Sequence, residues 1–284
     1  LFTGNIARLF KTEDYLIMLV EITIQTIAIY ALTGIFAGLM GGMLGLGGGI
    51  IIVPVLHYIF TQQGFASSVV MHQAVTTSLA TIIITSLFAT YTHHQKKAVS
   101  WPIVNRIAPG VLLGACFGAL VADSLSSNIL RIFFGLFEIL VAIQIWFEIR
   151  PMSNISLPGA GGFIISGLGI GLFSTLLGIG GGTLTVPFLL WCNLNIRNAV
   201  AISSACSFPI AAAGTTAFII AGWDSLNIFT HSIGYLYWPA ALIIVAMTIF
   251  FAPIGAHLAH YLPIEILKRS FAILLMIVGI KMLI

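Results

Sequence analysis

Charged side chains are scarce in this sequence of 284 residues. Asp, Glu, Lys and Arg together make up 7% of the chain, whereas an ordinary soluble domain carries about 25%. A chain with so little charge could not cover its surface in water, which excludes a soluble globular protein. The net charge of +3 is small, and no basic stretch is interleaved with aromatic residues, so the sequence predicts no nucleic-acid partner.

Cysteine and catalytic motifs are scarce as well. Cys116, Cys192 and Cys206 lie in or beside apolar segments and form no C-x-x-C pair, which favours small core side chains over a metal or redox role. The sequence has no H-x-x-x-H pair, acidic pair or nucleophile motif of the kind that an intramembrane enzyme requires. We therefore expect a protein without a catalytic residue, a metal or a cofactor.

Hydrophobic residues dominate instead, at 59% of the chain, with a mean hydropathy of +1.11. A helix needs about 20 apolar residues to cross a hydrocarbon core about 30 Å thick, and stretches of this length recur. They predict an all-α, polytopic helical protein that crosses a lipid bilayer. We expect full spans near 73–92, 103–122, 129–149, 199–221, 236–257 and 265–284, and two glycine-interrupted regions near 20–61 and 160–193.

Two glycine runs in these regions repeat each other almost letter for letter. LGLGGGIIIVP at 44–54 matches LGIGGGTLTVP at 177–187 with an offset of 133. Further matches in the same order join AVTTS at 74–78 to AVAIS at 199–203, and Trp101-Pro102 to Trp238-Pro239. The duplication divides the chain into an N-terminal segment at 1–23 and transmembrane repeats at 24–150 and 151–284, with a polar linker rich in Pro and Gly at 148–162.

The basic residues predict how the two repeats are oriented. The loop at 92–101 holds Lys96 and Lys97, its counterpart at 222–227 holds no Lys or Arg, and Arg197 follows the second glycine run. Positive residues mark cytoplasmic loops, so this exchange indicates an inverted repeat. Each repeat then contains a glycine-broken helical hairpin followed by three transmembrane helices. A four-helix unit repeated in parallel is the alternative.

A glycine run inside an apolar region can break a helix and create an anion site. A helix that stops at Gly45 to Gly47 and restarts near Gly48 and Gly49 exposes about four backbone N–H groups. With the positive helix end, these groups bind an anion without a basic side chain. Close helix packing is the alternative role of the glycines, but their duplication favours the site. The equivalent glycines of the second run are Gly178, Gly180, Gly181 and Gly182.

Proline and polar residues follow each glycine run. Pro54 and Pro187 each lie five residues beyond the last glycine, and we expect them to terminate or kink the short helix that follows. Thr183 and Thr185 lie in the second short helix, whereas their counterparts in the first are apolar, so the two half-sites would differ. Further candidates to bind an oxyanion are Gln73, Thr76, Thr77 and Ser78, matched by Asn198, Ser203 and Ser204. Hydrogen bonding to the preceding turn of their own helix is the alternative role of these side chains.

Ionisable residues inside the apolar spans are few, and Glu138 lies in the middle of one. Such a residue marks a functional site by default. Glu138 is a candidate to carry protons for coupled transport, and the alternative is a neutral carboxyl that is hydrogen-bonded to a neighbouring helix.

The duplicated pattern from Gly38 to Pro54 and from Gly171 to Pro187 resembles the TauE/SafE sulfite-exporter family of membrane permeases. The AVTTS segment, the basic loop before Trp101-Pro102 and the G-x-x-x-G at 114–118 also fit. The resemblance implies transport of sulfite, sulfoacetate or related organosulfonates by a multi-pass secondary carrier in a bacterial inner membrane.

The sequence thus predicts a secondary transporter that binds a small sulfur-containing anion at two half-helix N-termini near the membrane midplane. An anion channel of the same architecture and a non-transporting membrane scaffold are the alternatives, and a cation substrate is a further one. The sequence identifies neither the particular anion nor the direction of transport. A homo-oligomer is compatible with it.

Overall fold

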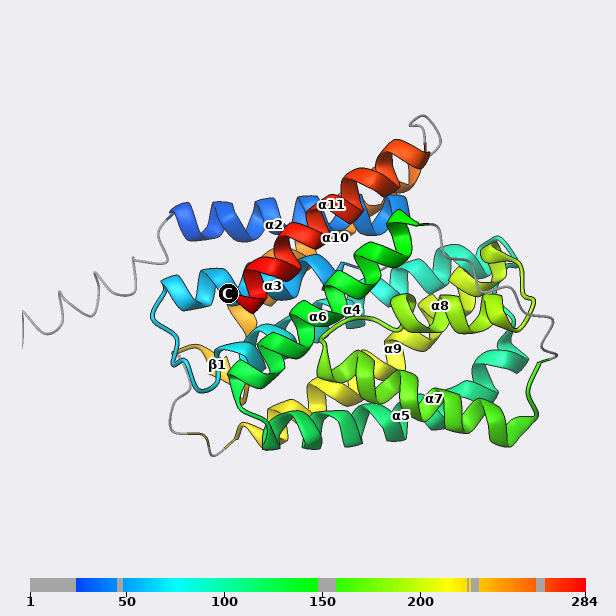
Figure 1. Ribbon diagram of the computed structural model, residues 1–284, viewed down its shortest axis with the longest axis horizontal. Coiled ribbons are helices and arrows are strands. Elements are labelled where there is room, and N and C mark those ends of the chain that lie inside the picture. Colours follow the sequence, from blue (N-terminus) through cyan, green and yellow to red (C-terminus); the bar gives the residue numbers. More distant parts are fainter. Residues whose placement is uncertain (1–23, 45–47, 148–156, 224, 226–229, 259–263) are drawn as a thin grey trace, which may run out of the picture.

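The computed structural model describes residues 24–44, 48–147, 157–223, 225, 230–258 and 264–284 (Figure 1). The predicted N-terminal segment at 1–23, the glycines Gly45 and Gly47 and most of the predicted linker lie outside the described residues.

Two series of five helices follow one another along the described residues. The first series, which we call the first half, contains α2 (Ile24–Leu44), α3 (Gly49–Gln62), α4 (Val70–Gln95), α5 (Trp101–Ser124) and α6 (Ser127–Trp146). The second half contains α7 (Ala160–Leu176), α8 (Gly182–Trp191), α9 (Ile196–Ala221), α10 (Trp238–Leu258) and α11 (Ile264–Leu283). Each predicted span coincides with one helix, and six described helices are long and apolar enough to cross a membrane. The prediction of an all-α, polytopic membrane protein is confirmed.

The helix breaks lie where the glycine runs predict them. Helix α2 ends at Leu44 and α3 begins at Gly49, while α7 ends at Leu176 and α8 begins at Gly182. Gly178 lies within the second break at φ +64, in the left-handed region that a residue with a Cβ adopts only with strain. Each glycine region therefore forms a longer helix followed by a shorter one.

The prediction that Pro54 and Pro187 terminate the short helices was wrong. Both residues lie inside their helices, since α3 continues to Gln62 and α8 to Trp191. Each proline is the sixth residue of its helix, so it removes a single N–H donor. Ending the helix would instead leave many backbone groups without partners in an apolar environment. Continuing past the proline is therefore the less costly outcome.

A short β-hairpin between α9 and α10 was not predicted. Strands β1 (Ser232–Ile233) and β2 (Leu236–Tyr237) pair antiparallel, and the turn between them holds Gly234 at φ +54. The hairpin docks on α4, because the Tyr237 N–H donates to Thr77 Oγ1 at 3.1 Å. Strands of two residues are too short to leave a pattern of alternating side chains.

The outer helices form two pairs, α5 with α7 and α2 with α10, each with one helix from each half. In the first pair, a Cβ added to Gly110, Gly114 or Gly118 would collide with a backbone carbonyl of α7. In the second pair, a Cβ on Gly34 would lie 2.7 Å from the carbonyl oxygen of Ile244. Glycine permits this close backbone approach, which is how membrane helices gain packing energy without a hydrophobic driving force.

Helices α4 and α9, the third members of the two halves, pack together and run in opposite directions (Figure 1). A Cβ on Gly214 of α9 would lie 3.0 Å from Cδ1 of Leu79 on α4. The start of α9 lies beside the end of α4, where Arg197 Nη2 donates to the Lys96 carbonyl oxygen at 3.5 Å. These opposite directions are the ones that an inverted repeat predicts.

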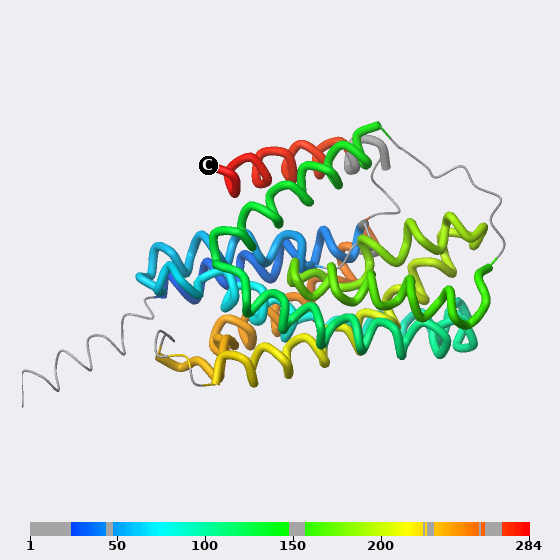
Figure 2. The backbone as a smooth tube through the Cα atoms, turned by 60° about the horizontal axis from the view of Figure 1, so that its bottom comes forward, coloured from blue at the N-terminus to red at the C-terminus, as the bar shows by residue number. Residues whose placement is uncertain are grey.

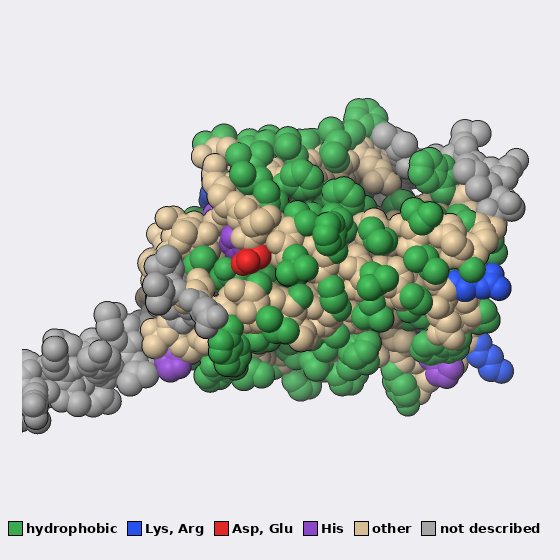
Figure 3. Space-filling model, turned by 90° about the horizontal axis from the view of Figure 1, so that it is seen from below, with side chains coloured by type: hydrophobic (Ala, Val, Ile, Leu, Met, Phe, Trp, Pro, Cys, Tyr) green, Lys and Arg blue, Asp and Glu red, His purple; other side chains and the backbone are tan. Residues whose placement is uncertain are grey.

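The contact between Arg197 and Lys96 also brings the basic loops of the two halves to one end of the molecule. Figure 3 shows most of the visible Lys and Arg side chains at that end, with apolar side chains spread over the face beyond it. This distribution suits a protein whose middle lies in hydrocarbon and whose ends lie at the membrane surfaces.

Helices α6 and α11, the last members of the two halves, form a third mixed pair. They cross where a Cβ on Gly135 would lie 2.9 Å from the carbonyl oxygen of Gly279. They also run antiparallel, since Trp146, at the end of α6, and Ala272, early in α11, line the same groove. Figure 2 shows this pair together on one side of the remaining helices.

Candidate functional site

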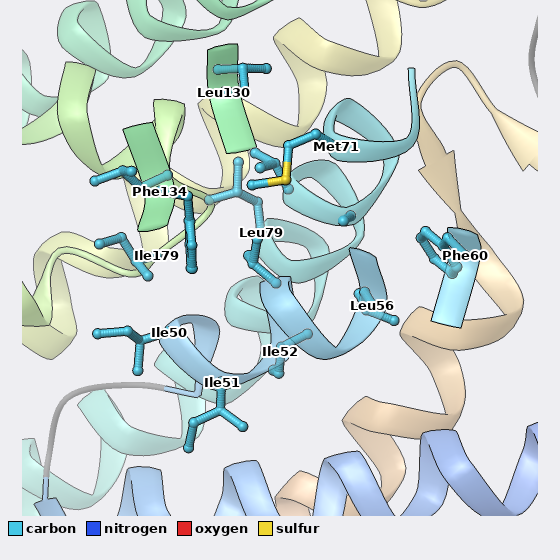
Figure 4. Close-up of a cluster of buried hydrophobic side chains, with 14 of the residues drawn as sticks. Ile50, Ile51, Ile52, Leu56, Phe60, Met71, Leu79, Leu130, Phe134 and Ile179 are labelled. Atoms are coloured by element: carbon cyan, nitrogen blue, oxygen red, sulfur yellow. The ribbon is translucent and has the colours of Figure 1, made fainter. Parts of the chain in front are cut away.

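The two glycine runs, 133 residues apart in sequence, meet in space. A Cβ on Gly49, the first residue of α3, would lie 2.7 Å from the Gly178 carbonyl oxygen and 3.0 Å from Cα of Ile179. Only glycine permits this contact. We call the meeting point, formed by residues 48–49 and 177–182, the glycine junction. Figure 4 shows Ile50 and Ile179, one from each run, in the same apolar cluster as Leu79 and Phe134.

The glycine junction lies halfway along the two central helices. The Cβ position of Gly49 is 3.0 Å from Cδ1 of Ile82, which stands at the middle of α4. The Cβ position of Gly180 is 3.2 Å from Oγ of Ser207, near the middle of α9. Helices α3 and α8 therefore begin in the middle of the molecule, where a span-length helix would be at the bilayer midplane.

Both short helices begin without a side-chain cap. Gly48 and Gly181 occupy the N-cap positions, and neither helix has a capping hydrogen bond from a side chain. The Gly48 carbonyl accepts from the N–H groups of Ile51 and Ile52, and the Gly181 carbonyl accepts from Thr185 N–H at 2.7 Å. The N–H groups at the start of each helix have no acceptor within that helix and carry its partial positive charge. They can donate to an anion placed between the runs.

Five buried hydroxyl groups of the second half have no hydrogen-bond partner among the described residues. Ser and Thr in membrane helices commonly donate to the carbonyl one turn back, as Thr76 does to the His72 carbonyl at 2.7 Å. Thr185 Oγ1 lies 3.0 Å from the Cβ position of Gly181, beside the start of α8. We call the five residues the hydroxyl cluster: Ser174, Thr175, Thr183, Thr185 and Thr215.

The hydroxyl cluster surrounds the second glycine run. Ser174 and Thr175 end α7, and their carbonyls accept from the N–H groups of Ile179 and Gly178 at 3.0 and 3.1 Å. Thr175 Oγ1 is also 3.2 Å from the Cβ position of Gly214, the neighbour of Thr215 on α9. A buried hydroxyl without a partner costs free energy, so these groups are suited to bind a polar ligand.

The structure brings some of the sequence-predicted residues to the glycine junction. Ser78 Oγ donates to the Gly178 carbonyl at 2.8 Å. Ser203 is buried one turn before Ser207, whose Oγ donates to the Ser203 carbonyl at 2.9 Å. Thr183 is buried in the first turn of α8 and belongs to the hydroxyl cluster.

Other predicted residues have different contacts. Thr76 and Ser204 donate to carbonyls of their own helices, which is the alternative role, and Thr77 accepts from the hairpin. Gln73 and Asn198 lie in the first turns of α4 and α9, at opposite ends of the molecule, and Gln73 Nε2 donates to Ser232 Oγ at 3.1 Å. The structure does not bring these two residues to the glycine junction.

Sequence reasoning missed Ser174, Thr175 and Thr215. Ser174 and Thr175 directly precede the second glycine run, but glycines stand at the equivalent positions of the first run. A search guided by the duplication therefore passed over them. A hydroxyl pair at the end of an apolar helix, directly before a glycine run, is the signal that could have found them.

Three further candidates lie apart from the glycine junction. Glu138 is fully buried on α6, and neither of its oxygens has a hydrogen-bond partner among the described residues. Cys192 and Cys206 are buried free thiols. In the part of the chain that the structure describes, no three His, Cys, Asp or Glu side chains are grouped so that they could hold a metal ion.

The sequence matches the family described as "Sulfite exporter TauE/SafE" over residues 30–282. The chain belongs to this family. The match includes both glycine runs and every described helix of the two halves. No solved structure matches the chain significantly.

Characterised relatives of this TauE/SafE chain are named as membrane transporters. A "Probable membrane transporter protein" of Haemophilus influenzae is 34% identical over 253 residues, which cover 88% of this chain and 96% of the relative. A protein of the same description from Methanocaldococcus jannaschii is 29% identical over 255 residues, covering 89% of this chain and 93% of the relative. The "Probable membrane transporter protein YunE" of Bacillus subtilis is 27% identical over 280 residues, covering 91% and 98%. These names indicate a family of membrane transporters rather than of enzymes.

Proposed function

We propose that the protein is a secondary transporter of small sulfur oxyanions, sulfite or a small organosulfonate, and that it binds the anion at the glycine junction. One observation carries the proposal: two uncapped helix N-termini meet halfway along the molecule, beside five buried hydroxyls that have no other described partner. The family's description as sulfite exporters supports the choice of a sulfur anion.

The chemistry of the junction matches such an anion. Sulfite and sulfonate groups carry three oxygens, each of which accepts hydrogen bonds from N–H and O–H donors. A hydrogen bond to a charged group contributes about 1.5–3 kcal/mol, and a helix N-terminus about 0.3–2 kcal/mol. Thr183 and Thr185, with the first N–H groups of α3 and α8, could supply enough donors without a buried basic side chain. The Gly178 carbonyl, which would attract a cation, already accepts from Ser78.

The proposed binding residues follow from this geometry. Gly48 and Gly49 would supply backbone N–H groups from the first half. The second half would supply backbone groups and hydroxyls, with Ser78 and Ser203 as supporting residues: Gly178, Gly180, Gly181, Gly182, Ser174, Thr175, Thr183, Thr185 and Thr215.

The charge distribution supports one orientation in the membrane. We place the end with Lys96, Lys97 and Arg197 in the cytoplasm, because positive residues favour that side. The two halves are then inserted with opposite orientations in the inner membrane, as in other carriers built from inverted repeats. The junction would lie near the midplane, reachable from either side when the surrounding helices move.

Binding by the purified protein in detergent tests the proposal. Sulfite, methanesulfonate, sulfate and chloride are titrated by calorimetry, with sodium gluconate and potassium gluconate as cation controls. The double variant Thr183→Val and Thr185→Val removes two hydroxyls at nearly constant volume. Its matched control is Thr61→Val with Thr92→Val, two exposed threonines that donate to carbonyls of their own helices.

We expect saturable binding of sulfite or methanesulfonate, weakened at least about tenfold in the Thr183 and Thr185 variant, because about 1.4 kcal/mol corresponds to a factor of ten. The control variant should bind like the wild type. Equal affinity in both variants would remove the hydroxyls from the site, and binding of a cation in place of the anions would reject the proposal. In liposomes, exchange of labelled for unlabelled substrate distinguishes a carrier from a channel, which gives no such exchange.

A further inference from the structure

We propose that Glu138 carries the proton that couples anion transport to the pH gradient, and that it exchanges this proton when α6 and α11 separate. This inference rests on the proposed transport function. It concerns a residue outside the glycine junction, so the two can be tested separately.

Glu138 lies at the closest approach of α6 and α11. The Cβ position of Gly279 on α11 is 3.2 Å from Cβ of Glu138 and 2.9 Å from the carbonyl oxygen of Gly135. The carboxyl is fully buried between two helices whose backbones nearly touch. It therefore faces protein rather than lipid.

The crossing is almost symmetric, and Glu138 breaks the symmetry. An offset of 137 matches Trp101 with Trp238, and it also matches Gly135 with Ala272 and Ala142 with Gly279. The same offset places Leu275 opposite Glu138, and Leu275 is a buried apolar residue. Since a leucine fills the equivalent position, a carboxyl is not needed there for packing.

Glu138 has no counter-charge among the described residues. Neither oxygen accepts or donates a hydrogen bond within that part of the chain. The helices packed against α6 are α11 and α4. Lys281 on α11 lies instead over the Tyr58 ring, at 4.5 Å from its centroid, and His72 Nε2 on α4 is 3.0 Å from the Ala122 carbonyl oxygen. The remaining titratable side chains described on these helices are Arg269 on α11 and Tyr91, His93 and His94 on α4, the last three in its final turn and a half.

The burial of an unpaired carboxylate costs several kcal/mol. This conformation therefore holds Glu138 in its neutral, protonated form. To release the proton, the carboxylate must reach water or a cation, which requires α6 and α11 to separate. An apolar cavity of about 210 Å³ already lies between them, one turn beyond Glu138, lined by Ala142, Trp146, Ala272, Ile273, Met276 and Ile277.

Movement of α6 would also be felt at the glycine junction. Phe134, one turn before Glu138, is fully buried in the same apolar cluster as Ile50 and Ile179 (Figure 4). Separation of α6 from α11 would change the packing around the starts of α3 and α8. One proton moved with a singly charged sulfonate makes the cycle electroneutral.

Transport of radiolabelled methanesulfonate into liposomes tests the inference. A sulfonate keeps its single negative charge over the working pH range, whereas sulfite does not, so the pH gradient acts on the protein alone. We measure accumulation driven by an imposed pH gradient, and separately the exchange of labelled for unlabelled substrate at equal pH. The variants are Glu138→Gln and Glu138→Asp, and Leu275→Met at the equivalent position is the matched control.

We expect Glu138→Gln to retain exchange but to lose gradient-driven accumulation, with its initial rate at least tenfold lower than that of the wild type. Glu138→Asp and Leu275→Met should retain both. If Glu138→Gln does not fold, Glu138→Leu, which copies Leu275, provides the same measurement. Accumulation at the wild-type rate without the carboxyl would overturn the inference, as would loss of exchange in a folded variant. If the wild type itself neither binds nor exchanges any anion of the panel, the proposed transport function fails instead.

Discussion

Replacement of Gly178 by alanine tests whether the glycine junction is as close as the structure has it. Gly178 lies at φ +64, and alanine in the left-handed region loses about 1–2 kcal/mol. The added Cβ would lie 2.9 Å from both Cγ2 of Val53 and Cα of Val75. Because Val75 offers backbone that cannot rotate away, overpacking adds about 1–3 kcal/mol. Together the free energy of unfolding should fall by about 2–5 kcal/mol.

Gly169 provides the matched control. It lies within α7, and an added Cβ would meet nothing within 4 Å. Alanine also has a helix propensity about 1 kcal/mol better than glycine. We therefore expect Gly169→Ala to leave the free energy of unfolding unchanged or to raise it slightly.

Equilibrium unfolding in mixed micelles of increasing SDS content measures both variants, followed by helical circular dichroism and tryptophan fluorescence. The two signals must give the same transition for a single free energy to be derived. Equal stability of Gly178→Ala and Gly169→Ala would refute the reasoning, because the second glycine run would then have room for a side chain.

Two further predictions concern hydrogen bonds near the central helices. Ser78→Ala should lower the free energy of unfolding by about 1–3 kcal/mol, since the Gly178 carbonyl loses its donor; Ser124→Ala, at an exposed residue, should change it by less than about 0.5 kcal/mol in the same assay, and an equal effect of the two would contradict the contact. The Tyr235 hydroxyl donates to Asp123 Oδ1 at 2.9 Å, and burial, aided by this hydrogen bond and the charge of Asp123, raises the pKa of Tyr235 to about 12. Since the folded state then holds the proton more tightly than the unfolded state, stability should fall as the pH rises from about 10 to about 12, and Tyr235→Phe should lose this part of the pH dependence.

The local features of the fold were predictable from the sequence. Apolar stretches of span length predicted the long helices, because a helix is the only simple way to satisfy the backbone in hydrocarbon. Both breaks were predictable from the glycine runs, since α3 begins at Gly49 and α8 at Gly182. The continuation of α3 past Pro54 was not, because it depends on the cost of unpaired backbone groups outside the helix.

The site was predictable only in part. The duplication pointed to both glycine runs and to Ser78, but the contact between Gly49 and Gly178 joins two halves that no local pattern links. The hydroxyl cluster exists only in the second half, so the comparison of repeats that found the glycines could not find Thr175 or Thr215. Gln73 and Asn198 were selected because they precede matched segments, and nine or more residues of helix separate them from the middle of α4 and α9.

The mixed pairing of outer helices has a consequence for how the protein assembles during synthesis. Helix α2 enters the bilayer first, yet the Thr248 hydroxyl that donates to its Gly34 carbonyl, at 3.3 Å, is made 214 residues later. Until α10 is inserted, the glycine face of α2 has only lipid beside it, and α5 likewise waits for α7. Neither half can therefore reach its final packing alone. Two separately produced halves should instead complement each other as a pair, each acting as the folding template for the other.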